Sequence, residues 1–194
     1  MKVVLGIGNP GREYEATRHN VGFRVVDRVA ASVGVEVRRR KFKGLLGEGM
    51  SGRERLLLVK PQTFVNLSGE CARAVIDYFG VEVDSLLVVS DDVNLPLAGL
   101  RCRRGGSSGG HKGLDSLIQH LGTPDFARLR VGVGRPMSGP EAEQGTGDLV
   151  GHVLGRFSEE ERPVAARAEA RAAAAVLVWA ESGLEECQNR FNRC

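Results

Sequence analysis

The sequence predicts an α/β sandwich of three layers, in which a mixed, mostly parallel and twisted sheet is flanked by helices. The fold is predicted from the alternation of two kinds of segment, and the single domain is predicted from length and composition. Short runs of branched apolar residues, typical of buried strands, alternate with segments whose apolar residues recur at helical spacing. The chain of 194 residues is 42% apolar and 26% charged, so it suits one domain over 1–194.

The first strand and the first helix are expected at the start of the chain. Lys2–Ile7 is short, apolar and β-branched, as in a buried strand. A helix is expected after Asn20, which would cap it, and before Gly34, which would end it. Its apolar residues at helical spacing are Val21, Val25, Val26, Val29 and Val33.

Further strands and a second helix are expected before residue 80. Residues 35–60 predict two or three strands broken at Gly44–Gly52, of which Arg55–Val59 is the last. Ser68 is expected to cap a helix that stops at Gly80.

The second half of the chain alternates in the same way. Leu86–Val89 is expected as a buried strand, Gly99–Arg104 as a more polar strand and Arg128–Gly134 as a third. The glycine–serine loop Gly105–Gly110 leads into a helix that ends near Gly122.

The last part of the chain predicts a loop and a long helix. Residues 135–148 are polar and glycine-rich, as in a loop. Ser158 and Glu161 form a capping box before an alanine-rich helix, which is expected to end near Gly183.

Cysteine and histidine spacing predicts neither disulfides nor a metal. The four cysteines form no C-x-x-C pair, so free thiols in a reducing cytoplasm are expected, and the histidines show no H-E-x-x-H spacing; the cysteines are Cys71, Cys102, Cys187 and Cys194. No apolar run is long enough for a membrane span or a signal peptide. We expect a cytoplasmic monomer without a cofactor.

The charges predict a polyanionic partner. The formal net charge is only +3, but basic residues gather in two clusters and acidic residues gather after Ser158. One cluster comprises Arg38, Arg39, Arg40, Lys41 and Lys43, and the other comprises Arg101, Arg103 and Arg104. Such clusters supply salt-dependent contacts to phosphates, although a basic run alone is more often a solvated face.

Three polar loops follow expected strands, over residues 6–22, 60–69 and 88–96. Sheets of this class bind ligands at the carboxyl ends of their strands, so we expect these loops to form one site. Its candidate residues are Asn9, His19, Asn66 and Asp91. They offer one base, one carboxylate to orient it and two amides to bind a carbonyl, but no strong nucleophile, which indicates activation of water.

Two other motifs fit less well. Gly6–Gly11 matches the dinucleotide pattern G-x-G-x-x-G, but no helix is expected to begin inside it, as binding of a pyrophosphate requires. Gly105–Gly109 matches G-x-S-x-G, which would make Ser107 a nucleophile, but the preceding strand is not apolar. The same loop offers backbone N–H groups beside Lys112, which could bind a phosphate.

Five blocks of sequence, taken in order, resemble bacterial-type peptidyl-tRNA hydrolase. They are GNPGREYEATRHNVG, KPQTFVNLSG, SDDVNLPLAG, GGSSGGHKG and RLRVGVGRP, and the later GHVLGRFSEEE also fits. The resemblance covers essentially the whole chain. It implies hydrolysis of the ester between a peptide and the terminal ribose of tRNA, which recycles the tRNA.

The resemblance also implies a role for each site residue. His19 would be the general base, Asp91 would orient it, and Asn9 would contact the peptide. Tyr14, Phe64 and Asn66 would hold the acyl group and the terminal adenosine. The tRNA phosphates would meet Arg101, Arg103 and Lys112.

The chain departs from the family pattern at three positions. Lys112 stands where the family usually has Asn, and an ammonium group can donate a hydrogen bond but cannot accept one. Val65 replaces a methionine, and Ser90 replaces an aromatic residue or histidine. Because of Lys112, the main alternative is a member of the same fold that binds RNA but hydrolyses weakly or not at all.

Overall fold

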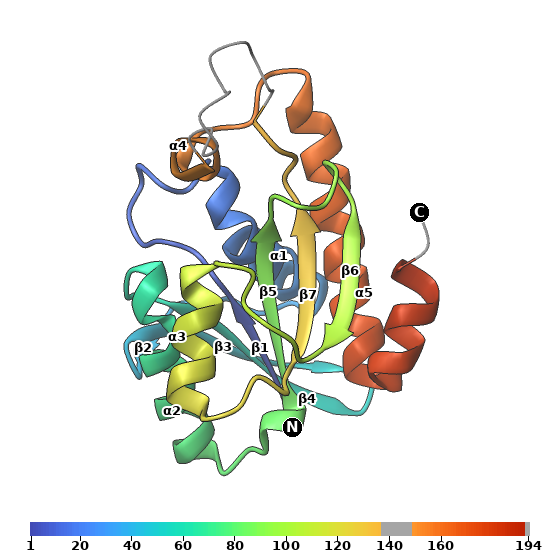
Figure 1. Ribbon diagram of the computed structural model, residues 1–194. Coiled ribbons are helices and arrows are strands. Elements are labelled where there is room, and N and C mark those ends of the chain that lie inside the picture. Colours follow the sequence, from blue (N-terminus) through green and yellow to red (C-terminus); the bar gives the residue numbers. More distant parts are fainter. Residues whose placement is uncertain (137–148, 193–194) are drawn as a thin grey trace.

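The computed structural model describes residues 1–136 and 149–192, and its seven strands form one sheet (Figure 1). The strands are β1 (Lys2–Gly6), β2 (Arg39–Lys41), β3 (Gly44–Ser51), β4 (Glu54–Pro61), β5 (Leu86–Asp92), β6 (Leu100–Arg104) and β7 (Ala127–Gly132). Their order across the sheet is β2-β3-β4-β1-β5-β7-β6. The four strands from β4 to β7 in this order are parallel, while β3 and β6 run antiparallel to their inner neighbours.

Helices cover both faces of the sheet, which confirms the predicted three-layer α/β sandwich. One face packs against α1 (Val21–Ser32) and α5 (Glu161–Phe191), and the other packs against α2 (Ser68–Phe79) and α3 (Lys112–Leu121). A short helix, α4 (Leu149–Leu154), stands at the end of the sheet towards which β5 points (Figure 1). None of the helices in the described ranges is long and apolar enough to cross a membrane.

The central strands read as continuous apolar runs because both of their faces are buried. Val4 of β1 packs with α1 and α5, whereas its neighbours Val3 and Leu5 pack with α2 and α3. The same alternation holds in β5, where Leu87 and Val88 point to opposite layers. Burial on both faces favours branched apolar residues at successive positions, which is the signal that predicted these strands.

The predicted break at Gly44–Gly52 is wrong, because Gly44–Ser51 is β3 and pairs with β4 along its whole length. The glycines serve close approach rather than a turn. A Cβ atom on Gly47 would lie 2.7 Å from the carbonyl oxygen of Glu36, so the chain after α1 crosses directly over this strand. Only Gly52, with φ of 56°, lies in the turn to β4.

Two predicted helix caps are also wrong. Asn20 precedes α1 but its side chain makes no capping bond, and Ser68 is the first residue of α2 rather than its cap. In contrast, the capping box is confirmed: Ser158 Oγ accepts from the Glu161 N–H at 3.2 Å, and Glu161 accepts in return from the Ser158 N–H at 2.8 Å. The final helix breaks at Gly183 as expected, but a further helical segment continues to Phe191. Most of the predicted loop 135–148 lies outside the described residues.

The start of α1 packs against the strand ends with no room for a side chain. A Cβ atom on Gly22 would lie 2.4 Å from the carbonyl oxygen of Ile7 and 2.6 Å from that of Val89. This contact fixes the end of the loop that carries His19.

We expect Gly22→Ala to lower the free energy of unfolding by about 2–3 kcal/mol, because the added methyl group must push α1 away from two strands. Chemical denaturation measures the effect. The matched control is Gly80→Ala, where a Cβ atom meets nothing within 4 Å and only the backbone angle, φ of 59°, is unfavourable. An equal loss in both variants would show that the contact with the strands contributes nothing.

Candidate active site

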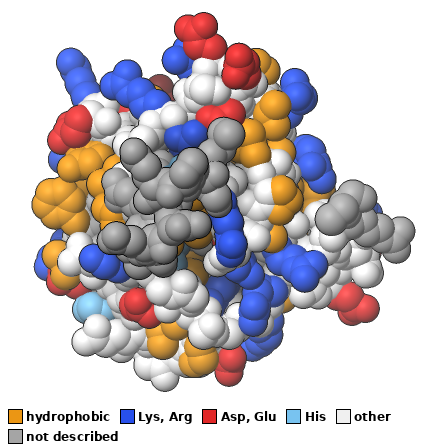
Figure 2. Space-filling model, turned by 45° about the horizontal axis from the view of Figure 1, so that its top comes forward, with side chains coloured by type: hydrophobic (Ala, Val, Ile, Leu, Met, Phe, Trp, Pro, Cys, Tyr) orange, Lys and Arg blue, Asp and Glu red, His pale blue; other side chains and the backbone are white. Residues whose placement is uncertain are grey.

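A cavity of about 480 Å³ opens beyond the carboxyl ends of β1 and β5. Its wall includes six predicted site residues from four different segments: Asn9, His19, Phe64, Asn66, Asp91 and Lys112. Figure 2 brings this end of the molecule forward and shows Lys and Arg side chains gathered on it beside apolar ones. The expectation that the polar loops converge is therefore met.

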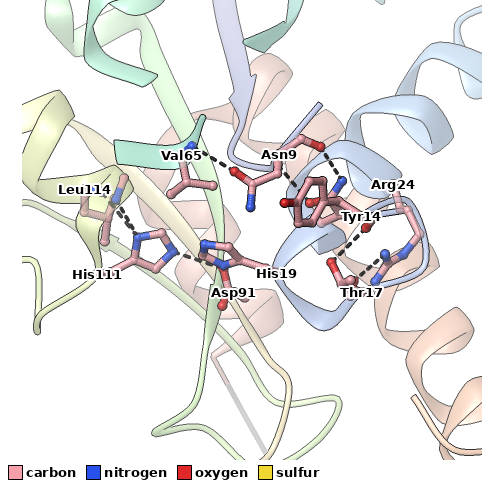
Figure 3. Close-up of polar contacts among 11 residues, drawn as sticks. Asn9, Tyr14, Thr17, His19, Arg24, Val65, Asp91, His111 and Leu114 are labelled. Atoms are coloured by element: carbon pink, nitrogen blue, oxygen red, sulfur yellow. Dashed lines mark hydrogen bonds and ion pairs between the residues drawn. The ribbon is translucent and has the colours of Figure 1, made fainter. Parts of the chain in front are cut away.

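At the base of the cavity, two imidazoles contact one buried carboxylate (Figure 3). Nδ1 of His19 lies 2.8 Å from Oδ1 of Asp91, and Nε2 of His111 lies 3.0 Å from the same oxygen. The side chain of Asp91 is 3% exposed, while the rings of His19 and His111 are 14% and 13% exposed. The neighbouring carboxylate, Asp92, instead forms an ion pair with Arg130.

Hydrogen bonds to the backbone determine the tautomer of His111. This residue precedes α3, and its Nδ1 accepts from the N–H groups of Gly113 at 3.1 Å and Leu114 at 3.4 Å. Nδ1 is therefore unprotonated, and the ring proton lies on Nε2, which donates to Asp91. His19 donates to the same carboxylate through Nδ1, which leaves its Nε2 as a lone-pair acceptor.

Asp91 is a carboxylate in this arrangement. Burial alone would raise its pKa, but the electrostatic attraction and hydrogen bond of the His111 ring, followed by those of the His19 ring, hold the pKa below the ordinary value for aspartate. Burial lowers the pKa of His111, but the Asp91 carboxylate outweighs it and raises that pKa overall. Full protonation of His111 would nevertheless place a proton on Nδ1 and break its bonds to the start of α3.

The same three residues have the spacing of a metal site, but their hydrogen bonds do not fit one. Potential ligand atoms of His19, Asp91 and His111 lie within 4.8 Å of one another. A neutral histidine that binds a metal through Nε2 carries its proton on Nδ1 and donates it to an acceptor. Nδ1 of His111 is itself an acceptor for two backbone N–H groups, so the arrangement suits proton transfer rather than metal binding.

Asn9 is held so that its amide N–H₂ group is available to a ligand (Figure 3). Its side-chain oxygen accepts from the N–H of Val65 at 3.0 Å. Its backbone is fixed by Asn20, whose side chain accepts from the Asn9 N–H and donates to the Asn9 carbonyl oxygen, both at 2.9 Å. The expected cap of α1 is thus a clamp on the neighbouring loop, and Nδ2 of Asn9 has no partner among the described residues.

Three further residues present unpaired groups to the cavity. The side chains of Asn66 and Lys112 make no hydrogen bond or ion pair with any described residue, and the ring of Phe64 is 57% exposed. Lys112 is the first residue of α3, so it adds a positive charge at the positive end of the helix dipole. This part of the wall can accommodate negative charge.

Tyr14, Arg101 and Arg103 do not line the cavity. Tyr14 is partly buried in the loop after β1. Arg101 and Arg103 are exposed on the edge strand β6, where the guanidinium of Arg103 packs against Gly106 of the glycine loop. The structure does not bring these three residues to Asp91.

The alternative nucleophile, Ser107, has no catalytic partners in the described structure. His152, which follows Ser107 in the order of a serine hydrolase and would be its base, instead bonds the carbonyl oxygen of Gly134 at 3.0 Å. The loop around Ser107 is held by Arg128, which is 1% exposed and donates to the carbonyl oxygens of Gly106 and Ser107 at 2.6 and 2.8 Å. Burial lowers the pKa of Arg128 to about 10, so its guanidinium stays charged at neutral pH.

Sequence reasoning missed His111 and the apolar wall formed by α4. His111 has no metal-like spacing and follows a glycine run, so the available signal was its place directly before a helix. A histidine there can cap the helix with one nitrogen and leave the other to donate. The α4 residues on the cavity wall are Leu149, Val150, Val153 and Leu154.

Comparison with known proteins agrees with this architecture. The family model described as "Peptidyl-tRNA hydrolase" matches residues 3–194. The peptidyl-tRNA hydrolase of Caldanaerobacter subterraneus subsp. tengcongensis is 48% identical over 99% of this chain and 100% of its own length, and that of Bacillus subtilis is 45% identical over 99% and 98%. The crystal structure of the Acinetobacter baumannii enzyme is similar with a TM-score of 0.88, at 30% identity over 99% of this chain and 94% of that one.

We expect Asp91→Asn to remove a pH-dependent part of the stability. The folded pKa of Asp91 is depressed, so its charge stabilises the folded state above the unfolded pKa of about 4, and this contribution is lost as the pH falls towards the folded pKa. The difference in free energy of unfolding between wild type and Asp91→Asn should therefore narrow by about 1–2 kcal/mol between about pH 6 and pH 3.

Urea denaturation at the two pH values measures this difference. The control is Asp115→Asn, which changes an exposed carboxylate with no partner in the described structure. A gap between wild type and Asp91→Asn that stays constant, or widens towards pH 3, would contradict the assigned charge state.

Proposed function

This chain belongs to the peptidyl-tRNA hydrolase family, and we propose that it hydrolyses the ester bond between a peptide, or an N-blocked aminoacyl group, and the terminal ribose of tRNA. The observation that carries the proposal is the state of His19: Nδ1 donates to a buried carboxylate while Nε2 is an acceptor in the cavity. That is the state a general base for water requires.

In the proposed reaction, Nε2 of His19 takes a proton from water as the water oxygen attacks the ester carbonyl carbon. The His19 imidazolium is stabilised by Asp91. The tetrahedral intermediate then collapses, the bond to the ribose oxygen breaks, and this oxygen takes the proton back from His19. The products are free tRNA and a peptide with a new carboxyl group.

The oxyanion of the intermediate needs donors, and two amides supply them. Nδ2 of Asn9 is oriented by the bond between Oδ1 and the Val65 N–H. Asn66 is exposed on the cavity wall and can donate in the same way. One such donor contributes about 3–4 kcal/mol to stabilisation of the transition state.

The rest of the cavity wall is assigned to the two halves of the substrate. The exposed Phe64 ring offers a surface on which the terminal adenosine stacks, and Tyr14, in the loop after β1, is assigned to the same part of the substrate. The apolar residues of α4 face the peptide. The acceptor arm of the tRNA extends over Lys112 towards Arg101 and Arg103, whose exposed guanidinium groups suit phosphates.

The proposal also covers the setting of the enzyme. It acts as a monomer of one domain, over 1–194, in the cytoplasm, where it rescues tRNA from interrupted translation. Its basic edge strand β6 is in keeping with an RNA substrate.

A second candidate function is RNA binding with weak or no hydrolysis. One observation favours it: Lys112 replaces the asparagine usual in the family and brings a cation to the cavity wall. Deacylation of N-acetyl-aminoacyl-tRNA separates the two candidates, because a binding protein would retain tight, salt-sensitive tRNA binding and release no acyl group.

We expect His19→Ala to lower kcat for deacylation by about 10²–10⁴-fold, because the base is lost. Affinity for tRNA, measured at fixed salt, should stay close to that of the wild type. The control is His120→Ala, since the His120 ring bonds the Ser116 carbonyl oxygen and is not among the described residues that line the cavity. Undiminished turnover in His19→Ala would refute the assignment of the base.

We expect Lys112→Asn to keep or raise turnover, because the amide restores a group that both donates and accepts a hydrogen bond. Single-turnover deacylation with saturating enzyme measures the chemical step directly. A loss of tenfold or more would show instead that the ammonium group of Lys112 takes part in catalysis.

A further inference from the structure

Two cysteines from distant parts of the chain lie in contact inside the protein. Cys102 is in β6, and Cys187 is in the part of α5 that follows Gly183. Their sulfur atoms are 2.7 Å apart, and the residues are 1% and 0% exposed. A disulfide joins sulfurs at about 2.05 Å, so a movement of less than about 1 Å would bring this pair to bonding distance.

The contact between the sulfurs is supported by polar bonds from the same segment. Asn192 accepts from the Cys102 N–H at 2.6 Å and donates to the Cys102 carbonyl oxygen at 2.9 Å. Gln188 donates to this oxygen at 3.4 Å. These bonds dock the end of α5 on the free edge of β6 without help from the sulfurs, so the two thiols are held together in the reduced protein.

The docked segment is a separate piece of helix. Gly183 has φ of 86° and ψ of 178°, which are not helical values, so the hydrogen-bonded ladder of α5 is interrupted there. Figure 1 shows the last, red part of α5 turned away from the main axis of the helix and lying beside β6. This piece can leave β6 while the rest of α5 stays packed on the sheet.

We propose that Cys102 and Cys187 form a reversible disulfide that fastens the end of α5 to β6. The oxidant is a low-molecular-weight disulfide. One protein thiolate attacks a sulfur of this disulfide and releases one small thiol; the second protein thiolate attacks the resulting mixed disulfide and releases the other. The protein gives up two protons and two electrons, and the oxidant is reduced to two thiols.

The reaction begins when the end of α5 lifts. In the docked state, the hydrogen bond to Cys187, together with burial, raises the pKa of the Cys102 thiol, so little thiolate is present. Cys187 lies on the piece that moves, so it is exposed first and accepts the small disulfide. Docking then returns it to Cys102, and the bond that forms closes a loop between positions separated by 85 residues.

The disulfide would stabilise β6, the edge strand that carries Arg101 and Arg103. Cys102 points into the core layer shared with α5, while its neighbours Arg101 and Arg103 point to solvent. A disulfide behind β6 therefore holds this strand in place when the edge frays, without occupying the surface that carries the arginines.

The other cysteines provide the controls. Cys71 belongs to α2, is buried in the opposite core layer and has no sulfur partner among the described residues. Cys194 lies outside the described residues, so the experiment uses a Cys194→Ser background to remove it as a competing thiol.

The test equilibrates the folded, full-length Cys194→Ser protein in oxidised and reduced glutathione, followed by acid quenching and mass spectrometry. We expect a loss of about 2 Da, a Cys102–Cys187 cross-linked peptide, and recovery of both thiols with dithiothreitol. The oxidised form should melt about 5–10 °C higher than the reduced form. Adding Cys71→Ala should leave cross-linking intact, and adding Cys187→Ala should abolish it.

The proposal is overturned if folded protein at an oxidising glutathione ratio keeps both thiols free, or collects glutathione on Cys187 without cross-linking to Cys102. Cys187→Ala also removes buried volume. Its melting temperature in reducing buffer is therefore compared with that of Cys187→Ser, which measures the effect of the substitution apart from that of the disulfide. An oxidised form that melts no higher than the reduced form would show that the bond does not fasten this segment.

Discussion

The buried charge of Asp91 is the constraint on which the candidate site depends. A carboxylate that is 3% exposed is stable only if hydrogen-bond donors replace the water it has lost. Here both donors are imidazole N–H groups, one from the loop after β1 and one from the residue before α3. Neither ring can turn away without leaving the charge unsatisfied. The charge therefore fixes the tautomer and orientation of His19, and leaves Nε2 of that ring as the acceptor in the cavity.

The sheet order explains how groups so distant in sequence reach one oxygen. β1 lies between β4 and β5 and runs parallel to both. The loops that follow these three strands therefore leave the sheet at the same end, where the carboxyl ends of the strands lie. Contacts between loops complete the arrangement. Asn20 clamps the backbone of Asn9, and Asn9 in turn accepts from Val65 in the loop after β4. Bonds between loops thus position the amide of Asn9, and the bond to Asp91 positions the base.

Much of this site could be predicted because its signals are local. Parallel strands that end in polar loops predicted the meeting of His19 with Asp91, and the central strands were recognisable because both of their faces are buried. The errors arise where a residue serves a distant partner. Asn20 has the residue type of a helix cap but bonds Asn9, and Gly47 has the residue type of a turn but allows Glu36 to pass over β3. His111 was missed because nothing in its own neighbourhood shows that a carboxylate 20 positions earlier lies beside its ring.

Lys112 makes the start of α3 favour a negative charge in the cavity. A lysine in the first turn opposes the helix dipole, so its ammonium group adds positive charge where the backbone N–H groups are already positive. Its predecessor His111 already satisfies two of those N–H groups but contributes no negative charge to the cavity, and Lys112 has no ion pair among the described residues. The ammonium group and the helix start therefore add positive potential to this wall, which Asp115 in the same turn offsets in part. An anionic group in the cavity relieves it, whether that group is a phosphate of the substrate or the oxygen that becomes negative during attack on the ester. The phosphate is already present in the bound substrate, whereas the oxygen becomes negative only during the attack. Lys112 would therefore affect the affinity through the phosphate and the rate through this oxygen.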